Sequence, residues 1–313
     1  MIGNDGGHRL KIILFMICTT LLLAPLTALH AAPPSAPTLA DVSYGPSPDQ
    51  LMDVYVPTNG AGPFPVLIWY GGVWVAAKHV PDLNHFLPEQ IAVIGVETRT
   101  LNDGMADKVA APVSYLMNDA CRAVQFVRMN AAKWNLDPKR IAVGGSSQGA
   151  LPALYVGCAG DRADPKSSDP VERLSTLITC VAAHRCQPSI DPKRIHDWDP
   201  AVEWGAPALG CSFKESLKRR DELLPMIQKW SPDHLLHKGA APIYFENNWG
   251  LTQPAAVKEM DYKVHSPVFA LGFQKLAQQA GVECYAKFPD HPTNGYKDVW
   301  DFLVQELKSP GRP

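Results

Sequence analysis

Short apolar runs alternate with helical patterns along most of this 313-residue chain. The runs lie at residues 66–69, 91–96, 141–143, 177–182, 242–245 and 282–288. Helical patterns begin at Pro112 and at Ser266, and a last one spans about residues 297–308. Such alternation is typical of a parallel sheet with helices on both faces.

Two further alternating runs precede this series, at residues 41–44 and 51–56. The turn-forming residues 45–48 separate them, so they predict an antiparallel edge to the sheet. Together the runs predict an α/β fold with a mostly parallel, eight-stranded sheet. Residues 186–240 follow neither period, and we interpret them as a cap-like insertion over the strand ends within one domain, residues 41–308.

The N-terminal segment has the composition of a secretory signal. Arg9 and Lys11 precede an apolar stretch over residues 12–29, and small residues follow at Ala31 and Ala32. We predict a signal peptide over residues 1–31, a flexible leader over residues 32–40, and a periplasmic or secreted protein without stable membrane insertion. The alternative is an uncleaved N-terminal anchor.

The charge balance and the cysteines of the chain bear on its binding partners and on its disulfides. With 29 Lys and Arg against 31 Asp and Glu, the formal charge is -2, which argues against a nucleic-acid partner. Six cysteines follow the signal, and Cys186 with Cys211 is the favoured disulfide pair in an exported protein. Three others lie in periodic apolar elements and are expected to be buried thiols: Cys121, Cys158 and Cys284.

The motif that carries chemistry is Gly-Ser-Ser-Gln-Gly at residues 145–149. This G-x-S-x-G sequence follows an apolar strand and precedes a helix, which is the setting of a nucleophile in a tight strand-to-helix turn. Gly145 and Gly149 avoid collisions in such a turn, and Ser147 is the predicted nucleophile. Backbone amides of Gly72, Val73 and Gln148 are the predicted oxyanion hole.

A serine nucleophile needs a base and an orienting acid, in the chain order Ser, acid, His. His291 follows the last predicted strand, so we predict that it is the base. Asp261 follows the preceding strand and is the predicted acid, with Glu259 and Glu246 as alternatives. The other histidines of the mature chain are expected to be solvated or structural: His79, His85, His184, His196, His234, His237 and His265.

These segments resemble the α/β-hydrolase esterases and lipases related to hormone-sensitive lipase and to the feruloyl and acetylxylan esterases. The resemblance is carried by residues 70–72, 119–128, 136–141, 145–149, 231–232 and 261–264, and by His291. It implies an α/β-hydrolase fold and a serine triad. Two features depart from the family pattern: Tyr-Gly-Gly-Val at residues 70–73 replaces His-Gly-Gly-Gly, and the loop from Glu246 to Asp261 is extended.

We therefore expect a serine carboxylic ester hydrolase that needs no cofactor or metal and forms an acyl-enzyme on Ser147. Its expected substrates are small-molecule or polysaccharide esters, and Trp74, Trp204 and Trp249 are candidates to line the substrate pocket. Two alternatives stay open. One is a serine peptidase of the prolyl oligopeptidase type, and the other is a non-catalytic binding protein on a hydrolase scaffold.

Overall fold

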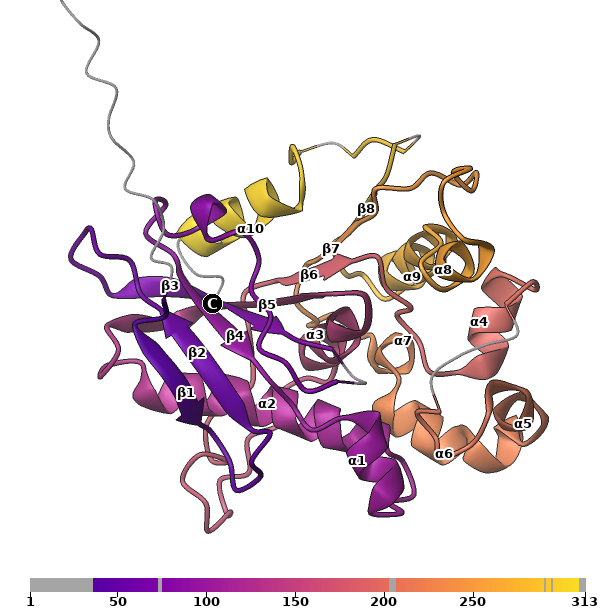
Figure 1. Cartoon of the computed structure of the whole chain (residues 1–313), viewed down its shortest axis with the longest axis horizontal. Helices are drawn as coiled ribbons and strands as arrows, with labels where there is room; N and C mark the ends of the chain where they lie inside the picture. Colours follow the sequence, from indigo (N-terminus) through magenta and orange to yellow (C-terminus); the bar gives the residue numbers. More distant parts are fainter. Residues whose placement is uncertain (1–35, 73–74, 203–206, 290, 294, 310–313) are drawn as a thin grey trace, which may run out of the picture. The chain divides into compact units, whose positions relative to one another are not determined.

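An eight-stranded sheet runs through the computed structural model, which describes residues 36–72, 75–202, 207–289, 291–293 and 295–309 (Figure 1). The strands are β1 (Leu39–Ser43), β2 (Leu51–Tyr55), β3 (Phe64–Tyr70), β4 (Ala92–Val96), β5 (Leu136–Ser146), β6 (Val181–His184), β7 (Ile243–Glu246) and β8 (Cys284–Lys287). Their spatial order is β1-β2-β4-β3-β5-β6-β7-β8. The described residues all belong to one compact unit.

The pairing confirms a mostly parallel sheet with an antiparallel edge. β1 pairs with β2 and β2 with β4 in antiparallel fashion, whereas every pair from β4 through β8 is parallel. Parallel strands place all their carboxyl ends at one edge of the sheet, where ligands bind in open α/β folds. At that edge Ser146, His184, Glu246 and Lys287 stand side by side in register on β5 to β8.

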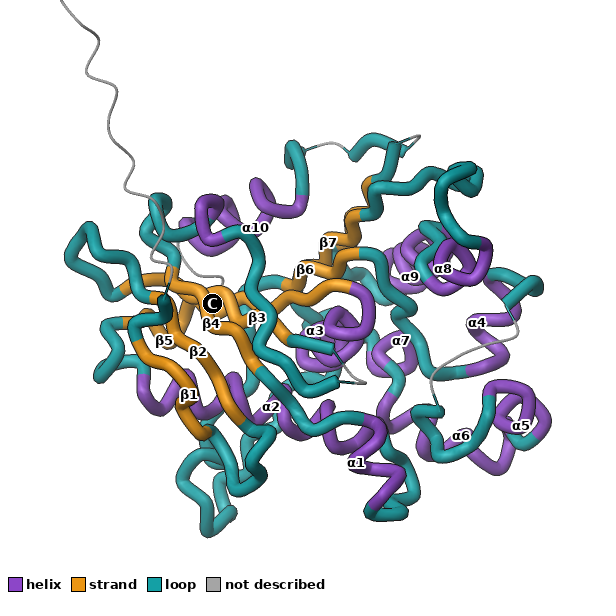
Figure 2. Tube along the Cα trace, in the orientation of Figure 1, coloured by secondary structure: helices purple, strands orange, loops and turns teal. Residues whose placement is uncertain are grey.

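Ten α-helices and two short 3₁₀ turns lie among the described residues (Figure 2). The helices are α1 (Leu101–Ala106), α2 (Val113–Asn130), α3 (Ala150–Cys158), α4 (Pro192–Trp198), α5 (Phe213–Lys218), α6 (Arg220–Trp230), α7 (Pro232–Leu235), α8 (Glu259–Val264), α9 (Val268–Gln279) and α10 (Val299–Lys308). The 3₁₀ turns are η1 (Leu83–His85) and η2 (Ser147–Gly149).

Helices cover both faces of the sheet, as the alternation of runs predicts. One hydrophobic core joins the sheet to α2, α3 and α9, and a second joins the opposite face to α10 (Figure 1). α2 begins directly after Pro112, whose fixed φ suits a helix start. Its predicted apolar stripe is fully buried: Val113, Leu116, Ala120, Ala123 and Val127. α9 ends before Gly281, which has a φ of 72° that glycine adopts without strain.

Residues 186–240 form α4 to α7, which pack against α2, α3 and α9. Their anchor is the Asp191 carboxylate, which accepts hydrogen bonds from the Arg220 guanidinium at 2.7 and 3.0 Å and pairs with His234 Nε2 at 2.9 Å. Burial alone raises the pKa of Asp191, but the hydrogen bonds from His234 and Arg220 outweigh it and hold that pKa well below its usual value. The charged carboxylate thus ties the start of α4 to α6 and α7.

The predicted disulfide is wrong, because all six cysteines of the described residues are free thiols. Cys186 is buried and its pKa is raised by that burial, whereas Cys211 is partly exposed. Cys121, Cys158 and Cys284 are buried as predicted. Several expectations lie outside the described residues, including the signal peptide, residues 32–35 of the leader, Val73, Trp74 and Trp204. The predicted leader also extends too far, because its last two residues, 39 and 40, belong to β1. Within the described ranges, no helix is long and apolar enough to cross a bilayer.

Candidate active site

Ser147 lies in the sharp turn between β5 and α3, at the carboxyl edge of the sheet. Its φ of 53° is a left-handed conformation that a non-glycine residue adopts only under strain, and such strain is common at functional sites. The two flanking glycines permit the turn. A Cβ on Gly145 would lie 2.2 Å from the carbonyl carbon of Gly149, and one on Gly149 would lie 2.3 Å from the carbonyl oxygen of Tyr70.

A histidine and a carboxylate extend from the Ser147 hydroxyl in one chain of hydrogen bonds. Ser147 Oγ lies 2.7 Å from His265 Nε2, and His265 Nδ1 lies 2.9 Å from Asp261 Oδ1. An ionised carboxylate only accepts, so beside it Nδ1 would carry the proton, and in the neutral form of the ring Nε2 is free to accept from Ser147. This is the tautomer in which an imidazole can remove a proton from a serine.

The Asp261–His265 pair comes from one short segment, because α8 and the residue after it place the two side chains four positions apart. His265 is mostly buried, with 17% of its side chain exposed, whereas Asp261 is 53% exposed. Two neighbours fix the imidazole. The buried amide of Asn247 donates to the carbonyl oxygen of His265 at 2.6 Å, and the ring of Trp249 meets the imidazole edge-on at 5.9 Å.

The structure differs here from the sequence-based prediction of the base. His291 does not contact Ser147; its ring stacks on Phe288 at 4.9 Å, and its backbone forms an isolated bridge with the same residue. The backbone bridge between Phe288 and His291, directly after β8, keeps the two rings next to each other. His265, expected to be structural, occupies the place beside the serine.

Among the three candidate acids, Asp261 alone contacts an imidazole within the described part of the chain. Glu259 instead forms an ion pair with Lys263 at 2.7 Å on the exposed side of α8. Glu246 accepts a hydrogen bond from the backbone amide of Val299 at 2.6 Å, and burial raises its pKa. Glu246 therefore fixes the start of α10 rather than a catalytic histidine.

One signal in the sequence could have identified His265. Asp261 and His265 are four residues apart, the spacing that brings two side chains to one face of a helix. The sequence alone does not predict the helix between them, because a segment of six residues is too short to show a clear periodicity. With that helix in place, acid and base both follow β7, so the chain order Ser, acid, His is preserved without a residue after β8.

The predicted oxyanion residues Gly72 and Gln148 lie on the two sides of the nucleophile. Gln148 follows Ser147 in the turn η2. Gly72 follows β3, and a Cβ on Gly72 would lie 4.0 Å from Gln148 Oε1. The loop before Gly72 is tightly packed, because a Cβ on Gly71 would lie 1.9 Å from the carbonyl oxygen of Ala77. The third predicted donor, Val73, lies outside the described residues.

A cavity of about 420 Å³ opens beside Ser147. Its walls come from the loop after β3, the nucleophile turn, the end of β6 and α10: Trp69, Tyr70, Gly71, Gly72, His79, Val80, Pro81, Ser146, Ser147, Gln148, His184 and Trp300. A cavity with a nucleophile and several polar groups is the general form of a small-ligand site.

His184 forms a second serine–histidine contact in this cavity. Its Nε2 lies 2.8 Å from Asn248 Oδ1, an acceptor, so its Nδ1 accepts from Ser146 Oγ at 3.2 Å. Burial lowers the pKa of His184, and the positive charge of Arg185 lowers it further. His184 is therefore a neutral ring with both nitrogens engaged, and it forms part of the cavity wall.

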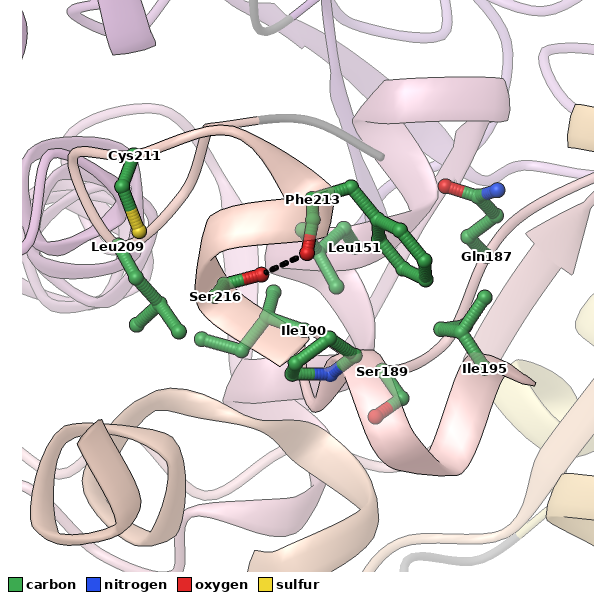
Figure 3. A pocket seen from close by; sticks show the side chains of 10 residues that line it. Leu151, Gln187, Ser189, Ile190, Ile195, Leu209, Cys211, Phe213 and Ser216 are labelled. Carbon is green, nitrogen blue, oxygen red and sulfur yellow. Dashed lines mark hydrogen bonds between the residues drawn. The ribbon is translucent and has the colours of Figure 1, made fainter. Parts of the chain in front are cut away.

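A second, small cavity of about 50 Å³ lies between α3 and the segment of α4 and α5 (Figure 3). Figure 3 shows Phe213 and Leu151 near the middle of the view, with Gln187 to one side and Cys211 and Leu209 to the other. The Phe213 carbonyl accepts a hydrogen bond from Ser216 Oγ at 2.8 Å.

Of the three tryptophans that the sequence predicts in the substrate pocket, Trp249 lies in the described residues, and its ring packs on His265 and Tyr262.

Within the described residues, no group of His, Cys, Asp and Glu side chains could hold a metal ion. The described groups at Ser147 are of the types that acyl transfer to a serine uses: a hydroxyl on a residue with a strained backbone, a histidine beside it, and a carboxylate behind the histidine.

Comparison with known proteins gives one family match and several relatives. The BD-FAE family model matches residues 52–198, which include the nucleophile turn. A probable isoprenylcysteine alpha-carbonyl methylesterase of Oryza sativa subsp. japonica is 29% identical over 151 residues, covering 46% of this chain and 34% of that protein. The chain thus spans about a third of the length of this curated relative.

Two solved structures share the fold over nearly the whole chain. A truncated carbohydrate esterase from gut microbiota has a TM-score of 0.62 and 18% identity, covering 87% of this chain and 96% of that one. An esterase from Thermogutta terrifontis, phosphonylated by sarin, has a TM-score of 0.52 and 16% identity, and the match covers 88% of this chain and 92% of that one. At these identities the likeness shows the α/β-hydrolase fold.

Proposed function

We propose that the chain is a serine carboxylic ester hydrolase working through Ser147, His265 and Asp261, a proposal supported by the esterases among its relatives and by the contacts of these three residues. The observation that carries this proposal is the 2.7 Å contact between the strained Ser147 hydroxyl and His265 Nε2. A serine hydroxyl is a weak nucleophile until a base accepts its proton, and this contact supplies that base.

The reaction runs in two halves. Ser147 Oγ attacks the ester carbonyl carbon while its proton passes to His265 Nε2, and Asp261 stabilises the imidazolium through Nδ1–H. The carbonyl oxygen becomes an oxyanion, which accepts hydrogen bonds from the backbone amides of Gln148 and Gly72. His265 then gives the proton to the departing alcohol. Water, deprotonated by His265, attacks the acyl-enzyme and releases the acid and Ser147.

Two alternatives predict different behaviour. A peptidase of the prolyl oligopeptidase type would cleave amide bonds with the same residues, and a binding protein on a hydrolase scaffold would cleave neither bond. The serine–histidine–aspartate chain of hydrogen bonds favours a catalyst over a binding module. The esterase named among the relatives favours ester over amide substrates.

The test is hydrolysis of a short-chain nitrophenyl ester by wild type, Ser147→Ala and Ser168→Ala. We expect Ser147→Ala to lose at least about 10⁴-fold in kcat/KM, because no covalent intermediate can form. Ser168→Ala is the control for loss of a serine hydroxyl at an exposed position, and it stays within about three-fold of wild type. Absence of ester turnover by wild type would overturn the proposal, and full activity of Ser147→Ala would remove Ser147 from it.

For the natural substrate and the cellular site, we propose acylated polysaccharides outside the cytoplasm. The carbohydrate esterase among the structural neighbours supports the substrate class, and the basic and apolar composition of residues 1–31 supports export. Release of acetate or ferulate from decorated polysaccharide tests the first part. N-terminal sequencing of the protein recovered from its native compartment tests the second.

A further inference from the structure

Arg185 directly follows β6, at the carboxyl edge of the sheet where the candidate active site lies. Its backbone has a φ of 45°, a strained value for a residue with a side chain. The backbone amide donates to the carbonyl oxygen of Glu246 at 2.9 Å, so this conformation is fixed by the neighbouring strand β7. Strained residues at the rim of a site are often held there for function.

The guanidinium of Arg185 has no oxygen partner among the described residues. Its Nε is buried without a hydrogen bond, and none of the ion pairs between described residues includes Arg185. Instead, the group lies over the ring of Trp249 at 5.3 Å, a cation–π contact that orients the side chain but leaves its N–H donors unused. Arg185 as a whole is only partly buried, but its Nε is covered and has no acceptor, and a covered donor of this kind calls for a ligand.

Two residues beside Arg185, Trp249 and His184, connect it to the proposed active site. Trp249, which supports the guanidinium, contacts the His265 ring edge-on at 5.9 Å. The charge of Arg185 also lowers the pKa of His184, whose ring lines the cavity beside Ser147. A second buried donor without a partner, Gln187 Nε2, lies two residues further along the same segment.

We propose that Arg185 binds a carboxylate carried by the ester substrate, so that the enzyme prefers anionic esters over neutral ones. This proposal rests on the ester hydrolysis proposed above and names the substrate class of that site. A carboxylate supplies the two acceptor oxygens that match the planar guanidinium fork, and it would satisfy the buried Nε. The donors here lack acceptors of their own, which favours an acceptor-rich, negatively charged ligand.

The test compares kcat/KM for matched esters that differ by one charge. On the acyl side, the pair is a nitrophenyl monoester of glutaric acid with its second carboxyl free, and the same ester with that carboxyl as a primary amide. On the alcohol side, the pair is nitrophenyl acetate with a ring carboxylate or a ring carboxamide. Each pair is measured with wild type, Arg185→Met, Arg185→Lys and the exposed Arg162→Met as a matched charge deletion.

We expect wild type to prefer the anionic member of one pair by about 30-fold, and the pair that shows this locates the carboxylate on the acyl or the alcohol side. Arg185→Met abolishes the preference, Arg185→Lys retains part of it, and Arg162→Met behaves as wild type. Equal rates for both members of both pairs would overturn the proposal while leaving ester hydrolysis intact. An equal loss for anionic and neutral esters in Arg185→Met, with a lowered Tm, would assign Arg185 a structural role instead.

A binding measurement keeps the inference separate from catalysis. Saturation-transfer NMR of wild type with glutarate, and with its neutral diamide, reports whether the site selects carboxylate even if no ester is turned over. We expect glutarate to bind wild type and not Arg185→Met. Equal signals from glutarate and the diamide would overturn the proposal, whatever the outcome for ester hydrolysis.

Discussion

Gly149→Ala should separate the geometry of the nucleophile turn from the stability of the fold. A Cβ at this position would lie 2.3 Å from the carbonyl oxygen of Tyr70 and 2.6 Å from that of Gly71, where ordinary contacts begin at 3.4 Å. Because both atoms are backbone, the loop after β3 must shift by roughly 1 Å relative to Ser147. That loop carries Gly72, so the displacement falls on the proposed oxyanion hole.

A misplacement of about 1 Å at a catalytic group costs on the order of 100-fold in rate. Overpacking of a well-packed region costs about 1–3 kcal/mol of unfolding free energy, which leaves a domain of this size folded. We therefore expect Gly149→Ala to lose about 100-fold in kcat/KM on a nitrophenyl ester, with a Tm reduced by only about 2–10 °C.

The matched control is Gly239→Ala, where the added Cβ meets only the His237 ring at 3.2 Å, a side chain that can move. This variant should keep the activity of wild type. Chromogenic assays and thermal unfolding of the three proteins measure both quantities. Activity of Gly149→Ala within about three-fold of wild type would refute the inferred contact between the two loops.

Three further predictions concern stability and thiols. Asp191→Asn should lose about 1–3 kcal/mol in chemical unfolding, because the buried Asp191 carboxylate is the charged acceptor of both Arg220 and His234. The pKa of Asp191 is lower in the folded than in the unfolded protein. Its contribution to the free energy of unfolding is therefore complete above the unfolded pKa of about 4 and is lost as pH falls through the folded pKa. If the free energy of unfolding of Asp191→Asn depended on acid pH as that of wild type does, this reasoning would be contradicted. Ser147→Gly should unfold at a higher temperature than Ser147→Ala, because glycine adopts a φ of 53° without strain, and the reverse order would count against strain in the turn. Thiol titration in denaturant should give the same count with and without prior reduction, whereas a lower count without reduction would reveal a disulfide.

Long periodic elements of this fold could be predicted from the sequence. The stripe of α2 and the Ser-Pro start and Gly281 stop of α9 are local signals, and tertiary packing agrees with them. The ends of strands were less predictable where an apolar run in the sequence extends beyond the residues that are buried in the sheet. The run at residues 177–182 predicts a strand, but β6 spans Val181–His184, because Leu177 is 53% exposed and lies before the sheet.

The nucleophile was predictable and the histidine was not, for a physical reason. Ser147 could be predicted because the tight turn around it leaves no room for a Cβ at Gly145 or Gly149, and these glycines lie next to it in the sequence. The partner of Ser147 depends on where the chain after β7 places its side chains, and that is set by α8, a six-residue helix stabilised by tertiary contacts such as Asn247 to His265. Position after the last strand pointed to His291, whereas the four-residue spacing from Asp261 indicates His265.

The central claim is that His265 activates Ser147. The most direct measurement is the rate at which a fluorophosphonate labels Ser147 in wild type, His265→Gln and His291→Gln, with the modified residue identified by peptide mass spectrometry. We predict that His265→Gln slows labelling by about 100-fold or more, while His291→Gln stays within about three-fold of wild type. Fast labelling of His265→Gln together with slow labelling of His291→Gln would contradict the account.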